Sequence, residues 1–472
     1  MKKDDLFRHI SSYFPYEMTD CQCRTVSTFT DFLYEGGQHS VFLLRGSAGT
    51  GKTSLASAIV RSLRALGQKI VLLAPTGRAA KVFSQHSCNS AYTIHRRIYR
   101  QKTFAGDFNL NFNSLKNTLF FVDESSMISS QSADTASGFG GALLDNLVQF
   151  VYQGSGCRLV LIGDTAQLPP VGEEQSYALN GDYMHHYGLE VYETDLDEVL
   201  RQSFESGILH NATSIRLTSG IPKVRFNGFA DMRMVPGNEL IETLMSSYSE
   251  VGEDETMVVT RSNKRANVYN QGIRLQCLDR EDMLSSGDML MIVKNKYLNQ
   301  EQQKQFAEKA NDSTFEFIAN GDRARVERVR NIRELYGFCF ADVVLKFPDY
   351  NNAELQLTVL TDTLTAEAPA LTFEQQQSLQ ERILEDYMDI PTKTERMKKL
   401  REDIYYNAVQ VKYAYAVTCH KAQGGQWAHV YIDQGYMTQE MFNADYVHWL
   451  YTAITRATER VFLVNWPKSQ TE

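Results

Sequence analysis

One segment, residues 46–53, constrains the fold of this chain more than any other. It reads Gly-Ser-Ala-Gly-Thr-Gly-Lys-Thr and matches the pattern G-x-x-x-x-G-K-[ST]. The apolar run 41–44 precedes it, and residues 53–66, which are rich in Ala, Leu, Ile and Arg, follow it. A strand, a glycine-rich turn and a helix in this order are the context in which the pattern binds phosphate. The sequence therefore predicts a phosphate-binding loop rather than a glycine-rich turn that matches by chance.

The composition of this loop suggests how it would hold a nucleotide. Glycines allow backbone N–H groups to surround phosphate oxygens, and the start of a helix adds positive potential. We expect Lys52 to reach the β- and γ-phosphates of ATP and the hydroxyl group of Thr53 to bind Mg²⁺. The residues expected to contact the nucleotide are Gly49, Thr50, Gly51, Lys52, Thr53 and Ser54.

Two other apolar runs end in polar residues that suit the same chemistry. Residues 119–122 are followed by Asp123 and Glu124, and residues 159–162 lead to Gln167. The carboxyl ends of parallel strands meet at one edge of a sheet, where such folds bind ligands. We expect Asp123 to hold Mg²⁺, Glu124 to deprotonate the attacking water and Gln167 to sense the γ-phosphate. The alternative roles are a helix cap for the two acids and a proline-stiffened loop for the glutamine.

The distribution of apolar runs predicts an α/β protein. Runs of four or five apolar residues suit the central strands of a parallel sheet that is covered on both faces, and helical segments lie between them. A chain of 472 residues has room for about two to four domains. The sequence contains no long low-complexity linker, so we expect nested domains. The runs occur at 41–44, 70–74, 119–122, 159–162, 257–260 and 461–464.

Other regions depart from this pattern. Residues 96–118 are polar and suit a hairpin inserted between two strands, and residues 129–141, rich in Ser and Gly, indicate a surface loop. Residues 322–365 contain stretches of alternating apolar and polar residues. Such alternation is typical of antiparallel strands and predicts a small barrel. A charged helical segment, about 373–403, follows it.

Composition and charge narrow the compartment and the function. No apolar run approaches the ~18 residues needed to cross a bilayer, and the N-terminus lacks the apolar core of a signal peptide. The seven cysteines are scattered without Cys-x-x-Cys spacing, which indicates reduced thiols in a cytoplasm. The formal net charge of −9 argues against a generally basic nucleic-acid coat but allows a narrow basic groove.

Together these motifs resemble the superfamily 1 DNA helicases, and most of all the 5′→3′ branch (superfamily 1B) of RecD-like and PIF-type enzymes. The resemblance extends from about Thr19 to Arg460, with the motifs in the expected order. It implies two RecA-like cores with helices on both faces of parallel sheets, ATP and Mg²⁺ between the cores, and single-stranded DNA across their top. It also implies a small SH3-like barrel and a short β-hairpin. The expected domains are 1–205, the first core; 206–321 and 410–472, the second core; and 322–409, the inserted barrel with a helical extension.

The same resemblance implies an ATP-dependent DNA helicase, active in DNA repair or recombination, that works as a cytoplasmic monomer on single-stranded, duplex and fork DNA. Gln22 would read adenine, and Gly424 would lie near the nucleotide. Arg201 and Arg456 would be two arginine fingers that complete the ATP site when the cleft closes, because an arginine stays charged and its planar group matches phosphate oxygens. One position departs from many relatives, since Gln426 stands where they have an acid.

The DNA face needs hydroxyl groups, backbone N–H groups and cations for the phosphates, and flat side chains for the unstacked bases. Each such residue is, on its own, as often an ordinary surface or core group as a DNA contact. The residues expected to contact DNA are Pro75, Thr76, Gly77, Arg78, Lys81, Thr93, His95, Thr418, His420 and Lys421.

Residues 96–118 are also the segment expected to part the duplex. Gly106 and Asp107 form a plausible turn, and Phe104 and Phe108 flank it, so either ring could stack on the first base pair. The alternative is that these rings pack the base of the hairpin against the core.

Two other functions remain open from the sequence. One is a P-loop switch that binds nucleotide to regulate a partner without moving along DNA. The other is the helicase subunit of a recombination complex that carries a separate nuclease. Two arginines, a sensing glutamine and a catalytic Glu124 favour a motor over a slow switch.

Overall fold

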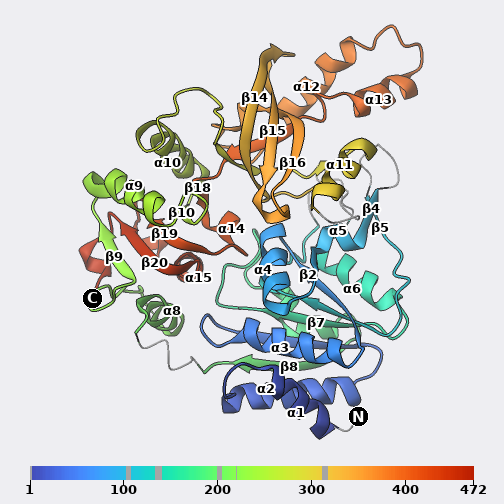
Figure 1. Ribbon diagram of the computed structural model, residues 1–472, viewed down its shortest axis with the longest axis vertical. Coiled ribbons are helices and arrows are strands. Elements are labelled where there is room, and N and C mark those ends of the chain that lie inside the picture. Colours follow the sequence, from blue (N-terminus) through green and yellow to red (C-terminus); the bar gives the residue numbers. More distant parts are fainter. Residues whose placement is uncertain (1–2, 102–107, 133–140, 199–204, 219, 311–316) are drawn as a thin grey trace.

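The computed structural model describes residues 3–101, 108–132, 141–198, 205–218, 220–310 and 317–472. Figure 1 shows an α/β body at the lower right, a second α/β body at the left and a mainly β body above them. The chain leaves the second α/β body to build the β body and then returns to complete it. The insertion therefore divides the second α/β body in the sequence.

The first α/β body, the first core, is built on a six-stranded sheet. Its strands are β1 (Ser40–Gly46), β2 (Lys69–Ala74), β3 (Ala91–Thr93), β6 (Thr118–Val122), β7 (Arg158–Gly163) and β8 (Glu190–Leu196), and its helices are α1 (Lys3–Tyr13), α2 (Asp20–Tyr34), α3 (Lys52–Ala65), α4 (Gly77–Ser87), α5 (Ile94–Ile98), α6 (Leu143–Gln153) and α7 (Gly181–His185). The order is β3-β2-β6-β7-β1-β8, and every pairing is parallel. Apolar side chains of α1 to α4 cluster on one face of the sheet, and those of α5 to α7 cluster on the other. Because both faces are covered, the central strands are apolar throughout, as the sequence predicts.

The second α/β body, the second core, has a five-stranded sheet of the same kind. Its strands are β9 (Met232–Val235), β10 (Thr256–Thr260), β18 (Ala416–Thr418), β19 (Trp427–Asp433) and β20 (Ala457–Val464), and its helices are α8 (Gly207–Leu217), α9 (Leu240–Glu250), α10 (Asn263–Gln276), α14 (Cys419–Ala422) and α15 (Ala444–Ile454). The order is β18-β10-β19-β20-β9, again with parallel pairings. Two parallel sheets covered by helices confirm the predicted α/β class.

The β body is a closed five-stranded barrel. Its strands are β11 (Met289–Ile292), β14 (Arg323–Leu335), β15 (Phe338–Phe347), β16 (Ala353–Leu360) and β17 (Val409–Tyr413). The alternating burial of β15 and β16 matches the alternation in the sequence, which confirms the predicted barrel. The barrel is larger than the expected segment 322–409. Two short strands close it: β11 lies before that segment, and β17 extends beyond its end.

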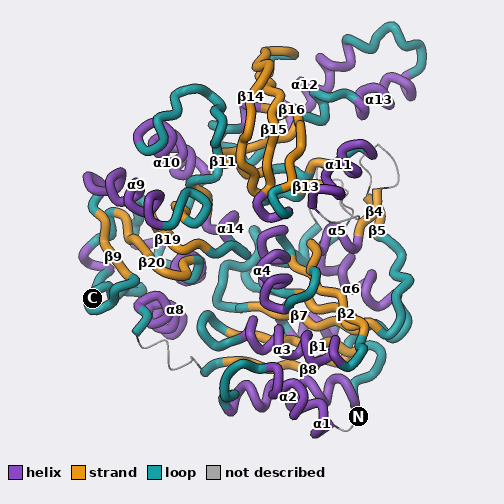
Figure 2. Tube along the Cα trace, in the orientation of Figure 1, coloured by secondary structure: helices purple, strands orange, loops and turns teal. Residues whose placement is uncertain are grey.

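The helical extension consists of α12 (Phe373–Glu385) and α13 (Lys393–Glu402). It projects from the barrel at the upper right of Figures 1 and 2. Leu379, Ile383 and Leu400 pack against Phe338 and Phe340 of the barrel in a separate apolar cluster. The extension is therefore attached to the barrel by its own small core.

Two small β elements complete the chain. One pairs β12 (Lys296–Tyr297) with β13 (Phe317–Ile318), on either side of α11 (Gln300–Ala310). The other pairs β4 (Tyr99–Gln101) with β5 (Phe108–Leu110) in antiparallel fashion, within the segment predicted to be a hairpin. The predicted turn and Phe104 lie outside the described residues, and so does the side chain of Phe108.

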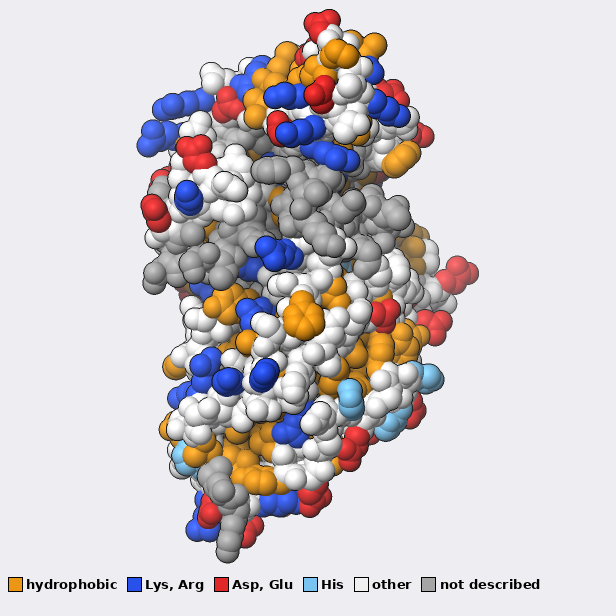
Figure 3. Space-filling model, turned by 90° about the vertical axis from the view of Figure 1, so that its right-hand side faces the viewer, with side chains coloured by type: hydrophobic (Ala, Val, Ile, Leu, Met, Phe, Trp, Pro, Cys, Tyr) orange, Lys and Arg blue, Asp and Glu red, His pale blue; other side chains and the backbone are white. Residues whose placement is uncertain are grey.

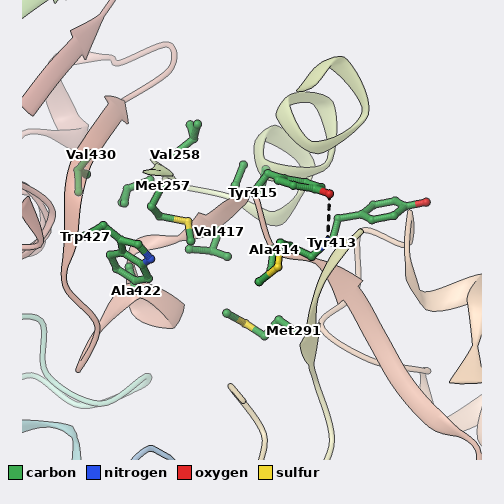
Figure 4. Packing of buried hydrophobic residues seen from close by; sticks show 14 of the residues in the cluster. Met257, Val258, Met291, Tyr413, Ala414, Tyr415, Val417, Ala422, Trp427 and Val430 are labelled. Carbon is green, nitrogen blue, oxygen red and sulfur yellow. Dashed lines mark hydrogen bonds between the residues drawn. The ribbon is translucent and has the colours of Figure 1, made fainter. Parts of the chain in front are cut away.

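The barrel and the second core share one apolar core. Figure 4 shows Trp427 and Met257 of the second core near Met291 and Tyr413 of the barrel. The two units are therefore packed as one body, although the barrel is an insertion in the sequence. In the part of the chain that the structure describes, no helix combines the length and apolar character needed to span a membrane.

Candidate active site and nucleic-acid interface

The phosphate loop connects β1 to α3. Gly49 and Gly51 have φ angles of 80° and 78°, a left-handed conformation that glycine adopts without strain. The Nζ atom of Lys52 donates a hydrogen bond to the carbonyl oxygen of Gly46, 2.8 Å away, so the ammonium group lies across the loop. The loop thus has the conformation that the sequence predicts. The other expected nucleotide contacts lie in the loop or in the first turn of α3: Thr50, Thr53 and Ser54.

Asp123 and Glu124 follow β6, two strands away from β1 in the same sheet. Burial and the neighbouring Glu124 raise the pKa of Asp123, and the ammonium group of Lys52 lowers it. The three charged groups therefore lie close enough to interact. Glu124 has a φ of 52°. A residue that is not glycine rarely adopts this conformation, and it persists mainly where a side chain has a functional position.

Among the buried oxygens at this edge of the sheet that have no hydrogen-bond partner in the described chain, two belong to residues expected to act on ATP. They are Oε2 of Glu124 and Oε1 of Gln167. An unsatisfied buried polar atom costs about 1–3 kcal/mol, so both oxygens mark places where a partner from outside the chain is expected. A water molecule next to a nucleotide's terminal phosphate would supply that partner. Together with the carboxylate of Asp123 and the hydroxyl of Thr53, this set fits a nucleotide with bound Mg²⁺.

Gln22 lies beside the phosphate loop. Its Nε2 donates to the carbonyl oxygen of Thr50 at 3.1 Å, and its Oε1 accepts from the backbone N–H of Thr19 at 3.1 Å. The second bond belongs to a capping box at the start of α2. Both amide atoms are thus bonded within the chain, and the adenine-reading role of Gln22 remains a prediction.

Arg456 follows α15 in the second core, where it is only 3% exposed. Its three nitrogens donate to the carbonyl oxygen of Thr452, the carbonyl oxygen of Gly425 and the hydroxyl of Thr455 at 3.0–3.2 Å. All three acceptors are neutral, so these bonds fix the guanidinium group without cancelling its charge. The other expected arginine finger, Arg201, lies outside the described residues.

Gly424 brings the second core into contact with the first. A β-carbon at this position would lie 2.9 Å from Oγ1 of Thr76 and 3.2 Å from the β-carbon of Ala79, both in the first core. Gly424 also has a φ of 70°. A larger residue here would therefore push the two cores apart, which explains the glycine in physical terms.

A pocket of about 700 Å³ opens between the cores at the start of the phosphate loop. Gly46 and Ser47 line its first-core side, and Asn443, His448 and Tyr451 of the α15 region line its second-core side. A nucleotide bound to the loop would therefore have the second core within reach, as the two-core arrangement requires.

Three of the threonines expected to contact DNA begin short helices at the carboxyl ends of strands. Thr76 caps α4 after β2, Thr93 caps α5 after β3, and Thr418 precedes α14 after β18. The side chains of Thr76 and Thr93 accept hydrogen bonds from backbone N–H groups in the first turns of their helices. The structure thus places these residues at the strand ends of both cores.

Arg78 and Lys81 lie in contacts between parts of the molecule. The guanidinium of Arg78 stacks on the ring of Trp427, 4.5 Å from its centroid, and donates to the carbonyl oxygen of Gln426. Gln426, which stands where many relatives have an acid, therefore joins the two cores through its backbone. Lys81 donates to the carbonyl oxygen of Pro348 in the barrel at 2.9 Å. The DNA contacts expected of Arg78 and Lys81 remain predictions, and both side chains already have partners.

Of the two histidines expected on the DNA face, His95 is half-buried and His420 is exposed. Burial lowers the pKa of His95 to about 4 and also lowers the pKa of His420. Both rings are therefore mainly neutral at pH 7, and they would meet DNA as hydrogen-bonding or stacking groups rather than as cations.

Sequence reasoning missed a set of lysines between the second core, the barrel and the helical extension. The ammonium groups of Lys294 and Lys296 donate to the side-chain oxygen of Gln376 at 3.2 Å and to the carbonyl oxygen of Asn407 at 2.7 Å. Lys412 likewise donates to a carbonyl oxygen. Burial lowers the pKa values of Lys296, Lys412 and Lys421 to about 8. Since the partners of Lys294, Lys296 and Lys412 are neutral, these three cations are suited to a polyanion such as a nucleic-acid backbone.

Lys412 lies in β17, whose five residues are all buried, and only the fold shows this burial. Figure 3 shows further Lys and Arg side chains, with acids among them, on the upper part of one face. The helical extension contributes exposed Lys393, Lys398, Lys399 and Arg401. These exposed cations all lie on α13, in a chain whose net charge is negative.

The sequence matches two family models. Residues 33–235 match the AAA domain, which covers the phosphate loop and both of its acids. Residues 413–464 match the UvrD-like helicase C-terminal domain, which covers α14, α15 and Arg456. Among curated proteins, the ATP-dependent RecD2 DNA helicase of Deinococcus radiodurans is 34% identical over 134 residues, which is 28% of this chain and 16% of that protein. The ATP-dependent DNA helicase dda of Enterobacteria phage T4 is 25% identical over 258 residues, which is 53% of this chain and 55% of that protein.

These matches support the predicted resemblance to the RecD/Pif-like helicases of superfamily 1B. The chain spans only 16% and 37% of the lengths of RecD2 and of an uncharacterized protein of Methanocaldococcus jannaschii. Its similarity to the second of these is 23% identity over 490 residues, 90% of this chain.

Among solved structures, a Bacteroides Pif1 helicase in complex with ADP-AlF3 and ssDNA has a TM-score of 0.47 and 13% identity, covering 97% of this chain and 95% of that one. The Pif1 helicase from Candida albicans has a TM-score of 0.44 and 16% identity, covering 96% of each chain.

Proposed function

We propose that this chain is an ATP-driven motor that moves 5′→3′ along single-stranded DNA and unwinds duplex DNA, with ATP hydrolysed between its two cores. The observation that carries the proposal is the meeting of two incomplete sites. The first core presents a phosphate loop with a buried, unsatisfied Glu124. The second core packs against the first through Gly424, and the carbonyl oxygen of the next residue, Gly425, accepts from the fixed guanidinium of Arg456.

The chemistry follows from this division. Bound Mg²⁺ would neutralise charge on the phosphates, and Thr53 and Asp123 are the residues that would hold it. Lys52 and the backbone of the phosphate loop would orient the β- and γ-phosphates. The carboxylate of Glu124 would accept the proton of the attacking water, and the amide of Gln167 would hold that water in line. Arg456 would stabilise the negative charge that develops in the transition state.

The path of the DNA strand is the second part of the proposal. Strands β2, β3 and β18 end in helix starts, which offer N–H groups to phosphates. The lysines under the helical extension add cations whose present partners are neutral. A strand lying across both cores would pass beneath this extension, which would then keep it in place.

The alternative function, a nucleotide switch, would bind ATP without moving along DNA. ATP turnover with and without a single-stranded oligonucleotide separates the two functions. A motor should hydrolyse ATP at least about tenfold faster with the oligonucleotide. A switch should show the same slow rate in both conditions. The remaining alternative, a helicase subunit beside a nuclease, would share the stimulation and would differ only in its protein partner.

A further inference from the structure

Tyr451 connects the two halves of the proposed ATP site through a single hydroxyl group. It lies on α15 of the second core and is only 1% exposed. Its hydroxyl oxygen accepts a hydrogen bond from the backbone N–H of Ala48 in the phosphate loop at 2.8 Å. The same hydroxyl donates to Oδ2 of Asp164, after β7, at 2.5 Å. One side chain of the second core thus contacts two strand ends of the first.

The residue next to Tyr451, Thr452, holds the other end of the loop that begins at Asp164 after β7. Oγ1 of Thr452 accepts from the backbone N–H of Leu168 at 2.8 Å, and Nε2 of Gln423 donates to the carbonyl oxygen of Leu168 at 2.6 Å. Residues 164–168 are therefore held at both ends by the second core. Gln167, whose Oε1 has no donor in the described chain, lies within this held segment.

The same helix also contacts the DNA side of the second core. The thiol of Cys419, in α14, donates to the carbonyl oxygen of Trp449 in α15 at 3.5 Å. Helix α14 carries His420 and Lys421, which are expected to contact DNA. A shift of α14 on binding a strand would therefore reach Tyr451 through a helix that packs directly against it.

We propose that Tyr451 is a positioning residue through which a nucleic-acid strand bound to the second core sets the geometry of the phosphate loop and of Gln167. The inference rests on the proposed function and names the group that couples its two sites. A hydroxyl is required, because only a group that both donates and accepts can satisfy an N–H and a carboxylate at once. Burial and the nearby Asp164 raise the pKa of Tyr451, so it keeps the proton that it donates.

The test uses Tyr451→Phe, which retains the ring and removes the hydroxyl. Tyr446→Phe is the matched control, because Tyr446 is buried on the same helix and donates only to Gln434 of its own core, at 2.7 Å. The kcat and KM for ATP are measured with and without a single-stranded oligonucleotide. In Tyr451→Phe, we expect the ratio of stimulated to unstimulated kcat to fall about tenfold while KM changes less than about threefold. Tyr446→Phe should keep the ratio of the wild type.

Several outcomes would overturn the inference. Equal stimulation in Tyr451→Phe and the wild type would show that the hydroxyl does not couple the sites. A raised KM with an unchanged ratio would make it a nucleotide-binding contact instead. A wild type without stimulation would overturn this inference and the proposed function together. If Tyr451→Phe unfolds at low temperature, Asp164→Ala removes the acceptor of the same hydroxyl, and an unchanged ratio in that variant would equally contradict the coupling.

Discussion

The two cores have the same layered architecture but contribute to the ATP site in different ways. In the first core, β1 ends in a glycine-rich loop whose backbone can bind phosphate. In the second core, β10 ends at Thr260, and Ser262 caps α10 with an ordinary side-chain bond. The second core instead offers side chains to its neighbour, including Tyr451 and Thr452. In the proposed function one core would therefore bind the nucleotide and the other would respond to it, which would convert hydrolysis into movement between the cores.

The largest effect should come from the first core. Lys52→Ala removes the cation at the phosphate loop, and Glu124→Gln removes the base, so each should lower kcat for ATP by about 10³-fold or more. Glu124→Gln should still bind ATP and DNA, because the amide has the same shape. Equilibrium binding of a fluorescent nucleotide together with turnover measures both effects. Near-normal hydrolysis by Glu124→Gln would show that another group accepts the proton.

Substitutions in the second core should lower ATP turnover nearly as much as those in the first core, and they should change DNA affinity much less. Arg456→Ala should lower kcat by about 10²-fold with little change in DNA affinity, because the charge acts on the transition state. Arg201→Ala, at the other expected finger, should behave in the same way. Steady-state kinetics with a DNA-binding titration tests the pair. Normal turnover in both variants would mean that the first core works alone, and the contrast between the cores would disappear.

The hairpin segment of the first core should affect unwinding alone. Phe104→Ala and Phe108→Ala remove the rings expected to stack at the duplex junction, where each base-pair step costs ~1.4 kcal/mol to open. If either ring is the wedge, its variant should unwind about tenfold more slowly while DNA-stimulated hydrolysis survives. Loss of thermal stability together with both activities would instead identify a packing residue. Normal unwinding in both variants would exclude this segment as the wedge.

The smallest effect should come from the lysines beneath the helical extension. A strand's phosphates bind the protonated form, so affinity should fall as pH rises through the lowered pKa values of about 8. Between pH 7 and 9 we expect a loss of several-fold, at most about tenfold for one lysine. Lys296→Arg is the matched control, because arginine stays charged throughout this range. A pH profile of oligonucleotide affinity that is identical in the wild type and Lys296→Arg would argue against this contact.

The contrast between the cores also shows what the sequence could predict. The positions of the phosphate loop, Asp123 and Glu124 were predictable, because each follows a short apolar strand. The barrel was predictable from the alternation in β15 and β16, whereas its closing strands β11 and β17 were not, since four or five residues are too few to establish a pattern. Contacts between the first core, the second core and the barrel leave no local pattern in the sequence. The partners of Arg78, Lys412 and Tyr451 come from segments far away in the chain, and only the fold brings them together.

The central claim is that the two cores act as one motor on DNA, with a direction. Unwinding of a duplex with a 5′ single-stranded tail, compared with the same duplex carrying a 3′ tail, tests it most directly. The account predicts ATP-dependent unwinding of the 5′-tailed duplex and little unwinding of the 3′-tailed one. Equal unwinding of both substrates would contradict the direction, and ATP hydrolysis without unwinding of either would contradict the motor itself.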